Sequence, residues 1–442
     1  MTPSLPRGLS GAPRSKTHAG HYSCVVTTPA AVRPHAAPLV ARTIVIDPAG
    51  PLIELLPDDA PLTWLHHGEG LVAWGEIARF ETMGHSRFVD AEKWWGEASS
   101  RAVLRDEVDV PGTGLIAFGS FAYADEPGSS VLVIPRTVVG RRGDLTWLTT
   151  ISRGALSAPT QPHRARPPAL PEGVVFSDGA MSGASWELAV AEAVARIRAG
   201  HLDKVVLARD LIAELDAPLD VRAPLARLAE RYPSCWTFHV EGLLGATPEM
   251  LVRRERGLVT SRILAGTIRR TGDDNHDMAL AATLARSSKD LEEHEFAVRS
   301  VASALAPHCL SMNVPESPFV LHLPNVMHLA TDVTGVLDDR TSSLGLAAAL
   351  HPSAAVGGTP TPDAVALISE LEHMDRGRYA GPVGWMDSHG DGEWGIALRT
   401  AEYEGKRVRL FAGCGIVADS DPEAELAEAA AKFIPIRDAL SG

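Results

Sequence analysis

Cysteine is scarce in this chain, and long apolar runs are absent from it. The 442 residues include four widely spaced cysteines (Cys24, Cys235, Cys309 and Cys414) that form no CxxC pair. This pattern excludes the common zinc and redox motifs and does not indicate a disulfide framework. No apolar run approaches the roughly 20 residues of a membrane-spanning helix, and no apolar segment near the start resembles a secretory signal. We therefore expect a cytoplasmic protein without a membrane partner.

Basic charge is also in short supply. Lysine and arginine number 41 against 55 aspartates and glutamates, which gives a formal net charge of −14. Because no basic run is long enough to attract a phosphate backbone, we do not expect a nucleic-acid partner. The chain also lacks GxSxG, HExxH and Walker A motifs. A GxGxxA stretch at 112–117 precedes a strand rather than a helix, which is the wrong context for a dinucleotide-binding loop.

What remains is the pattern of one large α+β domain. Residues 1–38, rich in proline and alanine, predict a flexible tail, and residues 39–442 predict a single domain. A proline-rich stretch at 157–171 predicts an exposed connector. Alternating and helical periodicities predict strands at 39–47, 114–124, 131–135 and 203–215, and helices at 185–200, 275–305 and 422–440. Because the strands cluster instead of alternating with helices, the pattern favours α+β over a doubly wound sheet.

Two pairs of acidic residues stand at helical spacing. Asp290 and Glu293 lie three residues apart in one predicted helix, and Glu425 and Glu428 lie three apart in another. On a helix, positions i and i+3 share a face, so each pair can direct two carboxylates at one point. Four such acids between two helices would need a hard cation, and magnesium fits. The alternative is an ordinary solvated acidic face.

Three further residues offer acid–base chemistry or charge. Lys432 follows Glu428 by four residues, which is either a surface ion pair or a cation that grips a substrate carboxylate. Lys204 opens an apolar strand, where it is either an edge residue or a base made neutral by burial. Glu249 lies among apolar neighbours, which would favour its protonated form and make it a usable acid.

Several segments, taken in chain order, resemble the chorismate-utilising enzymes. This family contains the isochorismate, anthranilate, salicylate and aminodeoxychorismate synthases. The matching segments fall between about residues 185 and 435 and read KVVLARD, LGATPEMLV, ILAGTIRR, SSKDLEEHEFAV, VMHLATDVTG, LHPSAAVGGTP, RGRYAGPVGWMDSHGDGEWGIALRTA and FAGCGIVADSDPEAELAEAAAK. They cover more than half of the chain in the family's order, so chance is a poor explanation.

The resemblance implies a fold and a metal site. The fold is one domain of two large antiparallel sheets packed face to face, with helices outside. The implied cofactor is Mg²⁺, bound by Glu293 and Glu428, with Glu425 and Asp290 in supporting positions.

The resemblance also implies chorismate as the substrate. Positions that hold its carboxylates match Tyr379, Arg399 and Lys432 together with the backbone at Gly413 and Gly415. Further substrate-binding positions match Gly266, Thr267, Ala355 and His328, although a structural role for His328 stays open. A monomer without an obligate amidotransferase subunit is expected.

A few positions distinguish the reactions within the family. The ammonia-using members carry glutamine where Lys204 stands, so the resemblance implies that Lys204 activates water for attack at ring carbon 2. Glu249 would protonate the hydroxyl that leaves carbon 4. Ala265 replaces a nucleophilic lysine of the aminodeoxychorismate synthases, and Ala355 replaces a threonine that is usual in members that eliminate pyruvate. Gly357 departs from the usual serine or threonine, which changes the local pocket shape.

The residues at these positions resemble those of the isochorismate synthase branch, whose members isomerise chorismate with Mg²⁺. Three alternatives stay open. A salicylate synthase would continue to salicylate and pyruvate, and an anthranilate synthase would consume ammonia. A catalytically silent member would bind chorismate without turning it over. The sequence does not decide between menaquinone, catechol siderophore and salicylate as the downstream pathway.

Overall fold

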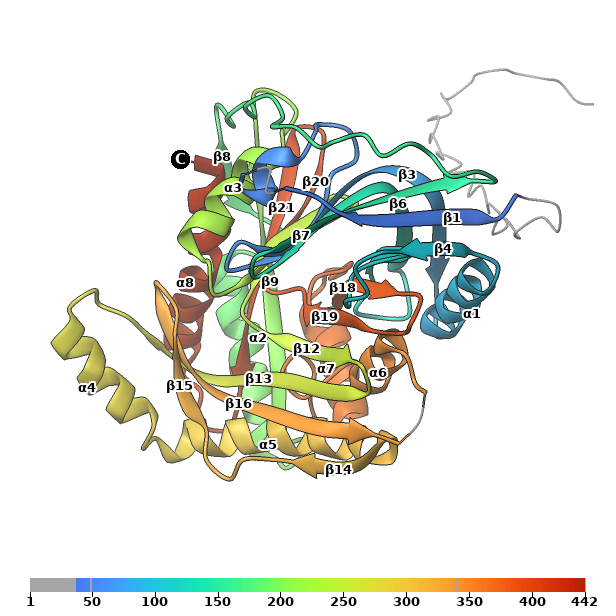
Figure 1. The fold of residues 1–442 in the computed structure, drawn as a ribbon. Helices are drawn as coiled ribbons and strands as arrows, with labels where there is room; N and C mark the ends of the chain where they lie inside the picture. Colours follow the sequence, from blue (N-terminus) through green and yellow to red (C-terminus); the bar gives the residue numbers. More distant parts are fainter. Residues whose placement is uncertain (1–36, 48–49, 339, 442) are drawn as a thin grey trace, which may run out of the picture.

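The structure is a computed structural model that describes residues 37–47, 50–338 and 340–441 (Figure 1). The predicted tail lies almost wholly outside the described residues, and its boundary at residue 38 stays a prediction. The strands are β1 (Leu39–Val45), β2 (Leu62–His66), β3 (Glu69–Met83), β4 (Val103–Asp106), β5 (Ile116–Ser120), β6 (Ser129–Arg142), β7 (Leu145–Arg153), β8 (Val175–Asp178), β9 (Lys204–Glu214), β10 (Trp236–Val240), β11 (Leu243–Thr247), β12 (Met250–Glu255), β13 (Leu258–Arg269), β14 (Cys309–Asn313), β15 (Phe319–His322), β16 (Val326–Leu337), β17 (Gly358–Thr359), β18 (Pro382–Asp387), β19 (Gly392–Ile396), β20 (Thr400–Glu404) and β21 (Arg407–Ile416).

Helices cover the outside of these strands. They are α1 (Arg87–Ser100), α2 (Gly183–Arg198), α3 (Arg222–Arg231), α4 (Asp274–Leu284), α5 (Ser288–Leu305), α6 (Ser343–Leu350), α7 (Thr361–Leu371) and α8 (Pro422–Ser441), with short 3-10 turns η1 (Leu52–Leu55) and η2 (Ala306–His308). None of the helices in the described part of the chain combines the length and apolarity of a membrane span.

The strands join into one hydrogen-bonded network that folds into two layers. One layer runs β16–β13–β12–β19–β18–β5, with β14 and β15 on the outer edge of β16. It continues through β6 and β3 into the second layer, β2–β10–β11–β20–β21–β9. Every pairing in these two layers is antiparallel. The α+β class and the two antiparallel layers are therefore confirmed, although strand pairing connects the layers.

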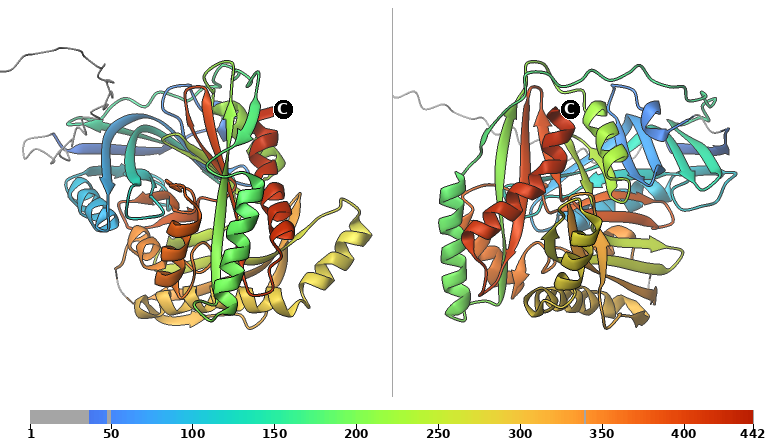
Figure 2. Two further views of the ribbon diagram at one scale, coloured as in Figure 1. Left: turned by 180° about the vertical axis from the view of Figure 1, so that it is seen from behind. Right: turned by 90° about the vertical axis from the view of Figure 1, so that its left-hand side faces the viewer.

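The two layers pack face to face over the main hydrophobic core. Leu207 of β9, Ile263 of β13 and Val333 of β16 belong to the same buried cluster although they come from opposite layers. Helices α2 and α8 cover the outer side of β9 and β21, where Figure 2 shows α2 lying along β9 with α8 beside it. On the other layer, α5 lies against β13 and β16. The outer helices thus leave the space between the layers for a site.

The predicted helix over 275–305 is wrong as a single element, because the chain forms α4 and α5 with a break between them. The side chain of Ser287 accepts a hydrogen bond from the backbone N–H of Asp290 and thereby begins a new helix. Serine competes for backbone hydrogen bonds in this way, which periodicity alone does not register. Helix α4 projects away from the rest of the protein in Figure 1.

The other predicted elements differ from the observed ones mainly at their ends. Helix α2 begins at Gly183, two residues before the predicted start, because Ser182 is its N-cap. The strand predicted at 114–124 is confined to β5, and the one at 131–135 is part of the much longer β6. The connector predicted at 157–171 forms no helix or strand, and Arg222 anchors it through the carbonyl of Arg166 at 3.1 Å.

Candidate active site

A cavity of about 240 Å³ lies between the two layers, lined from both sides. Every predicted site residue lines this cavity except Lys204. Those that do are Glu249, Gly266, Thr267, Asp290, Glu293, His328, Ala355, Tyr379, Arg399, Gly413, Gly415, Glu425, Glu428 and Lys432. They come from positions up to 183 residues apart along the chain, between Glu249 and Lys432. The fold alone brings them together.

Lys204 lies behind the cavity wall instead of in it. Its side chain is only 1% exposed, and its Nζ lies 3.0 Å from Oε1 of Glu293. Gly415 of the neighbouring strand β21 packs directly against the pair, since a Cβ at that position would lie 2.5 Å from Glu293 Oε1 and 3.1 Å from Cε of Lys204. Only glycine allows the strand to approach this ion pair so closely. The predicted base is thus present at the site, but it is paired with a predicted metal ligand.

Glu249 is a buried carboxyl at the turn between β11 and β12. Burial raises the pKa of Glu249 to about 8. Hydrogen bonding from the backbone N–H of Leu264 and the positive charges of Lys204, Lys432 and Arg399 oppose that rise. All three cations therefore lie near enough to influence Glu249. At neutral pH this side chain is a carboxylic acid, which is the form that can donate a proton.

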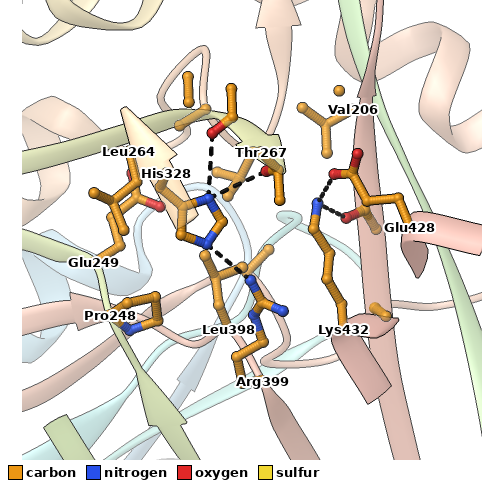
Figure 3. Close-up of a pocket in the computed structure, with 18 of the residues that line it drawn as sticks. Val206, Pro248, Glu249, Leu264, Thr267, His328, Leu398, Arg399, Glu428 and Lys432 are labelled. Carbon is orange, nitrogen blue, oxygen red and sulfur yellow. Dashed lines mark hydrogen bonds and ion pairs between the residues drawn. The ribbon is translucent and has the colours of Figure 1, made fainter. Parts of the chain in front are cut away.

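Glu428 lies on the opposite side of the cavity from Glu249 (Figure 3). Oε1 of Glu428 lies 2.6 Å from Nζ of Lys432, one helical turn away on α8. Glu425 is buried and accepts a hydrogen bond of 2.7 Å from the hydroxyl of Ser420. A carboxylate oxygen of Glu425 and one of Glu428 also lie within 4.8 Å of the sulfur of Cys414. The sequence analysis did not predict Cys414 as a site residue.

These carboxylates suit a hard divalent cation. Asp290, Glu293, Glu425 and Glu428 all offer oxygen to one cavity, and Mg²⁺ prefers one or two carboxylates with room for water and substrate. In this structure, ammonium groups contact two of them, Lys204 at Glu293 and Lys432 at Glu428. Residues Glu293 and Glu428 would hold such an ion between α5 and α8. These carboxylates fit Mg²⁺ because they are oxygen ligands and line the same cavity.

The guanidinium of Arg399 lines the cavity, and only part of its hydrogen-bonding capacity is used. Its Nη2 donates to Nε2 of His328 at 3.2 Å, but its buried Nη1 has no hydrogen-bond partner among the described residues. Burial lowers the pKa of Arg399, yet guanidinium groups stay charged in proteins. A buried cation with an unused donor calls for an anionic ligand.

His328 orients that guanidinium and stays neutral. Burial, followed by the charges of Arg399 and Lys432, lowers the pKa of His328 well below its usual value. Its Nε2 accepts from Arg399, so the proton is on Nδ1, which lies 3.1 Å from the hydroxyl of Thr267 and 3.3 Å from the carbonyl of Gly266. Figure 3 shows His328 between Thr267 and Arg399. The histidine links β13 and β16 to the cation that lines the cavity.

Tyr379 and Gly413 form another part of the wall. The Tyr379 ring stacks on Phe411 with centroids 5.1 Å apart, and burial raises the pKa of its phenol to about 12. A Cβ on Gly413 would approach the Tyr379 hydroxyl to 3.0 Å. The carbonyl of Gly413 accepts a hydrogen bond of 2.8 Å from Nζ of Lys432. A neutral hydroxyl, a cation and a bare backbone therefore meet in one corner.

Sequence reasoning missed several residues that line the cavity. Arg376, Val356, Val206 and Leu398 contribute to the wall, as does Phe411. Arg376 stands in the RGRYAG segment used for the resemblance, but nothing local in a sequence separates a buried arginine from an exposed one. Gly357, the departure noted above, adjoins Val356, and a Cβ there would lie 3.5 Å from the hydroxyl of Tyr123.

The sequence of this chain is similar to those of known proteins over most of its length. The sequence profile of the chorismate binding enzymes matches residues 62–441. The salicylate biosynthesis isochorismate synthase of Pseudomonas aeruginosa is 33% identical over 430 residues, which cover 91% of this chain and 90% of that protein. Isochorismate synthase MenF of Bacillus subtilis is 38% identical over 261 residues, or 58% of this chain and 55% of MenF. The chain thus spans little more than half the length of that relative.

Solved structures share the fold. DhbC from Bacillus anthracis superimposes with a TM-score of 0.74 at 32% sequence identity, and the match covers 88% of this chain and 98% of DhbC. The shared fold therefore extends over most of this chain.

Proposed function

The chain belongs to the family of chorismate binding enzymes, and we propose that it is a magnesium-dependent isochorismate synthase. One observation carries the proposal. A single cavity combines a buried carboxylic acid, Glu249, with the cations Arg399 and Lys432 and with the carboxylates of Glu293 and Glu428. This set matches the needs of a small dianionic ring that must gain a hydroxyl at one carbon and lose one at another.

Substrate binding in this proposal rests on the two cations. Chorismate carries two carboxylates at opposite ends. Nη1 of Arg399 is a buried donor without a partner among the residues that the structure describes, and Arg399 takes the pyruvyl carboxylate. Lys432 takes the ring carboxylate, and burial works against its charge while Cys414 and Glu428 raise the pKa of its ammonium. Mg²⁺ held by Glu293 and Glu428 would supply further positive charge beside the ring carboxylate and draw electron density from the ring.

Proton transfer is divided between Lys204 and Glu249. Lys204 accepts a proton from the water whose oxygen bonds to carbon 2, and Glu249 gives a proton to the hydroxyl that leaves carbon 4 as water. The ring double bonds shift between the two carbons, so one water enters and one departs. In this structure Nζ of Lys204 lies 3.0 Å from Oε1 of Glu293. Glu293 must therefore turn away before this amine can contact the attacking water.

The test is incubation of the purified protein with chorismate and Mg²⁺, with the products separated by chromatography. We expect isochorismate, and we expect the Lys204→Ala variant to make none while it keeps the wild-type circular dichroism spectrum. Salicylate and pyruvate formed without a partner lyase would favour the salicylate synthase alternative. Turnover by the alanine variant at the wild-type rate would contradict the role of Lys204.

The proposal extends to partners and location. Lys204 stands where the ammonia-using members carry glutamine, so we propose that the protein acts without an amidotransferase subunit, and we further propose a monomer in the cytoplasm. An assay with ammonia or glutamine added tests this, because anthranilate would form only if the ring accepts nitrogen. Relatives named MenF and DhbC are isochorismate synthases of Bacillus subtilis.

A further inference from the structure

A buried ion pair joins Glu372, which follows α7, to Arg376. Both side chains are at most 3% exposed. Nε of Arg376 donates to Oε2 of Glu372 at 2.9 Å, and Nη2 donates to Oε1 at 2.5 Å. This is a two-pronged contact, and the mechanism described above does not use either residue. Arg376 nevertheless lines the cavity.

The same two side chains hold three backbone groups that belong to two segments of the chain. Nη1 of Arg376 donates to the carbonyl of Val356 at 2.9 Å, and Nη2 donates to the carbonyl of Val206 at 2.7 Å. Oε1 of Glu372 accepts the backbone N–H of Ala208 at 2.7 Å. The guanidinium also lies 4.3 Å from the centroid of the Tyr123 ring. Strand β9 and the segment around Val356 are thus attached to one rigid planar group.

Those pieces of backbone carry the groups that the proposed reaction depends on. Val206 lies two residues after Lys204 on β9, and Ala355 precedes Val356 in the cavity wall. The wall is also tied to β9 directly, since the N–H of Val206 donates to the carbonyl of Gly357 at 2.8 Å. A shift of Val206 or Val356 by a fraction of an ångström would move the predicted base relative to the wall that faces the ring.

Stability alone gives a weak reason for this arrangement. Replacing a buried ion pair with apolar residues of similar volume is often neutral or stabilising, because both charges must be stripped of water. An ion pair that fixes two backbone carbonyls and one N–H instead restricts geometry. We propose that Glu372 and Arg376 are positioning residues, which set the placement of Lys204 against the Ala355–Val356 wall. This inference rests on the proposed function.

The test compares Arg376→Lys with Arg222→Lys, because the two arginines make similar contacts. Arg222 also makes a two-pronged contact with a carboxylate, that of Asp220, and also donates to two backbone carbonyls, those of Leu56 and Arg166. It does not line the cavity. Lysine keeps the charge in both variants but cannot reproduce the planar fork.

We expect Arg376→Lys to lower kcat for isochorismate formation about 10- to 100-fold with little change in KM for chorismate. The carboxylate grips of Arg399 and Lys432 are untouched, so binding should persist. Arg222→Lys should lower the melting temperature comparably and leave kcat at the wild-type level. A rise in KM without a fall in kcat, or equal kcat in the two variants, would overturn the inference.

Glu372→Asp provides a second variant in case Arg376→Lys does not fold. It keeps the charge but shortens the side chain by one methylene, so it cannot hold Arg376 and the N–H of Ala208 together. The same fall in kcat at constant KM is expected, and unchanged kcat would count against the positioning role. Wild-type turnover reports separately on the proposed function. An inactive wild type would overturn both proposals.

Discussion

At the scale of single residues, the chemistry depends on groups whose charge states the protein environment has changed. Glu249 is protonated because burial outweighs three neighbouring cations. His328 is neutral because burial and the charges of Arg399 and Lys432 all lower its pKa, and Nη1 of Arg399 has no hydrogen-bond partner in the described part of the chain. Each of these conditions is costly in a folded protein, which is typical of functional sites.

Glu249 gives the proposed reaction a dependence on pH. We expect kcat to fall as pH rises through about 8, because the carboxyl loses the proton that it must donate. Glu249→Gln should lower kcat about 10²- to 10⁴-fold. It should also remove the pH dependence that Glu249 gives to the free energy of unfolding. The folded-state pKa lies above the usual 4.5, so this carboxyl favours folding at low pH.

That contribution is lost as pH rises from about 4.5 to about 8. The glutamine variant should therefore gain stability relative to wild type across this window, by up to about 1.4 kcal/mol per pH unit. Urea unfolding at several pH values measures the difference. A stability difference that does not vary with pH would contradict the burial of an ionisable Glu249.

Arg399 gives a prediction about affinity. Arg399→Met removes the guanidinium that we assign to the pyruvyl carboxylate, and we expect KM for chorismate to rise about 10- to 100-fold, as for a lost charged hydrogen bond of ~1.5–3 kcal/mol. The melting temperature should stay near the wild-type value. Loss of the bond to His328 is offset by removal of a buried charge whose Nη1 has no partner within residues 37–47, 50–338 and 340–441. Steady-state kinetics and thermal unfolding together decide this, and an unchanged KM would argue against the assignment.

At the scale of elements, the break between α4 and α5 places an N-terminus at the cavity. Ser287 begins α5, and Asp290 and Glu293 follow within the first two turns. Had the helix continued from α4, no cap would fix these two carboxylates. Helix α8 supplies the opposing acids and Lys432 from its first three turns, with Pro435 only beyond them.

The cap of α5 can be tested against a matched cap elsewhere. Ser287→Ala removes the bond to the N–H of Asp290, and we expect a loss of about 1 kcal/mol in the free energy of unfolding. It should also raise the Mg²⁺ concentration needed for half-maximal activity. Ser182→Ala at the start of α2 should cost similar stability and leave the metal requirement unchanged. If both variants need the same Mg²⁺ concentration, the α5 cap does not help to position the metal ligands and the prediction is wrong.

At the scale of the whole molecule, two layers from one chain enclose the site, and ammonium groups contact two of its carboxylates. A chelator should therefore abolish activity without unfolding the protein, because Glu293 and Glu428 keep Lys204 and Lys432 as partners. Added Mg²⁺ should restore activity and raise the melting temperature with concentration, as any ligand of the folded state does. Full activity in excess chelator would contradict the magnesium proposal.

Much of the fold was predictable from local sequence. Alternation located β9, and periodicity located α2 and α8 to within a few residues, because these elements bury a regular face. The full length of β6, of which only residues 131–135 were predicted, and the break before α5 were missed. Strand length depends on partners far along the chain, and a serine inside a helical pattern reads the same whether or not it begins a helix.

The sequence by itself determined which chemical groups the site contains, since its motifs carry the acids, cations and glycines in family order. Only the tertiary structure decided their states and neighbours. It buried Glu249, paired Lys204 with Glu293 behind the cavity wall, and turned Arg376 inward onto Glu372. Residue identity fixes what a side chain can do, but its charge and contacts follow from burial and from residues far away in the chain.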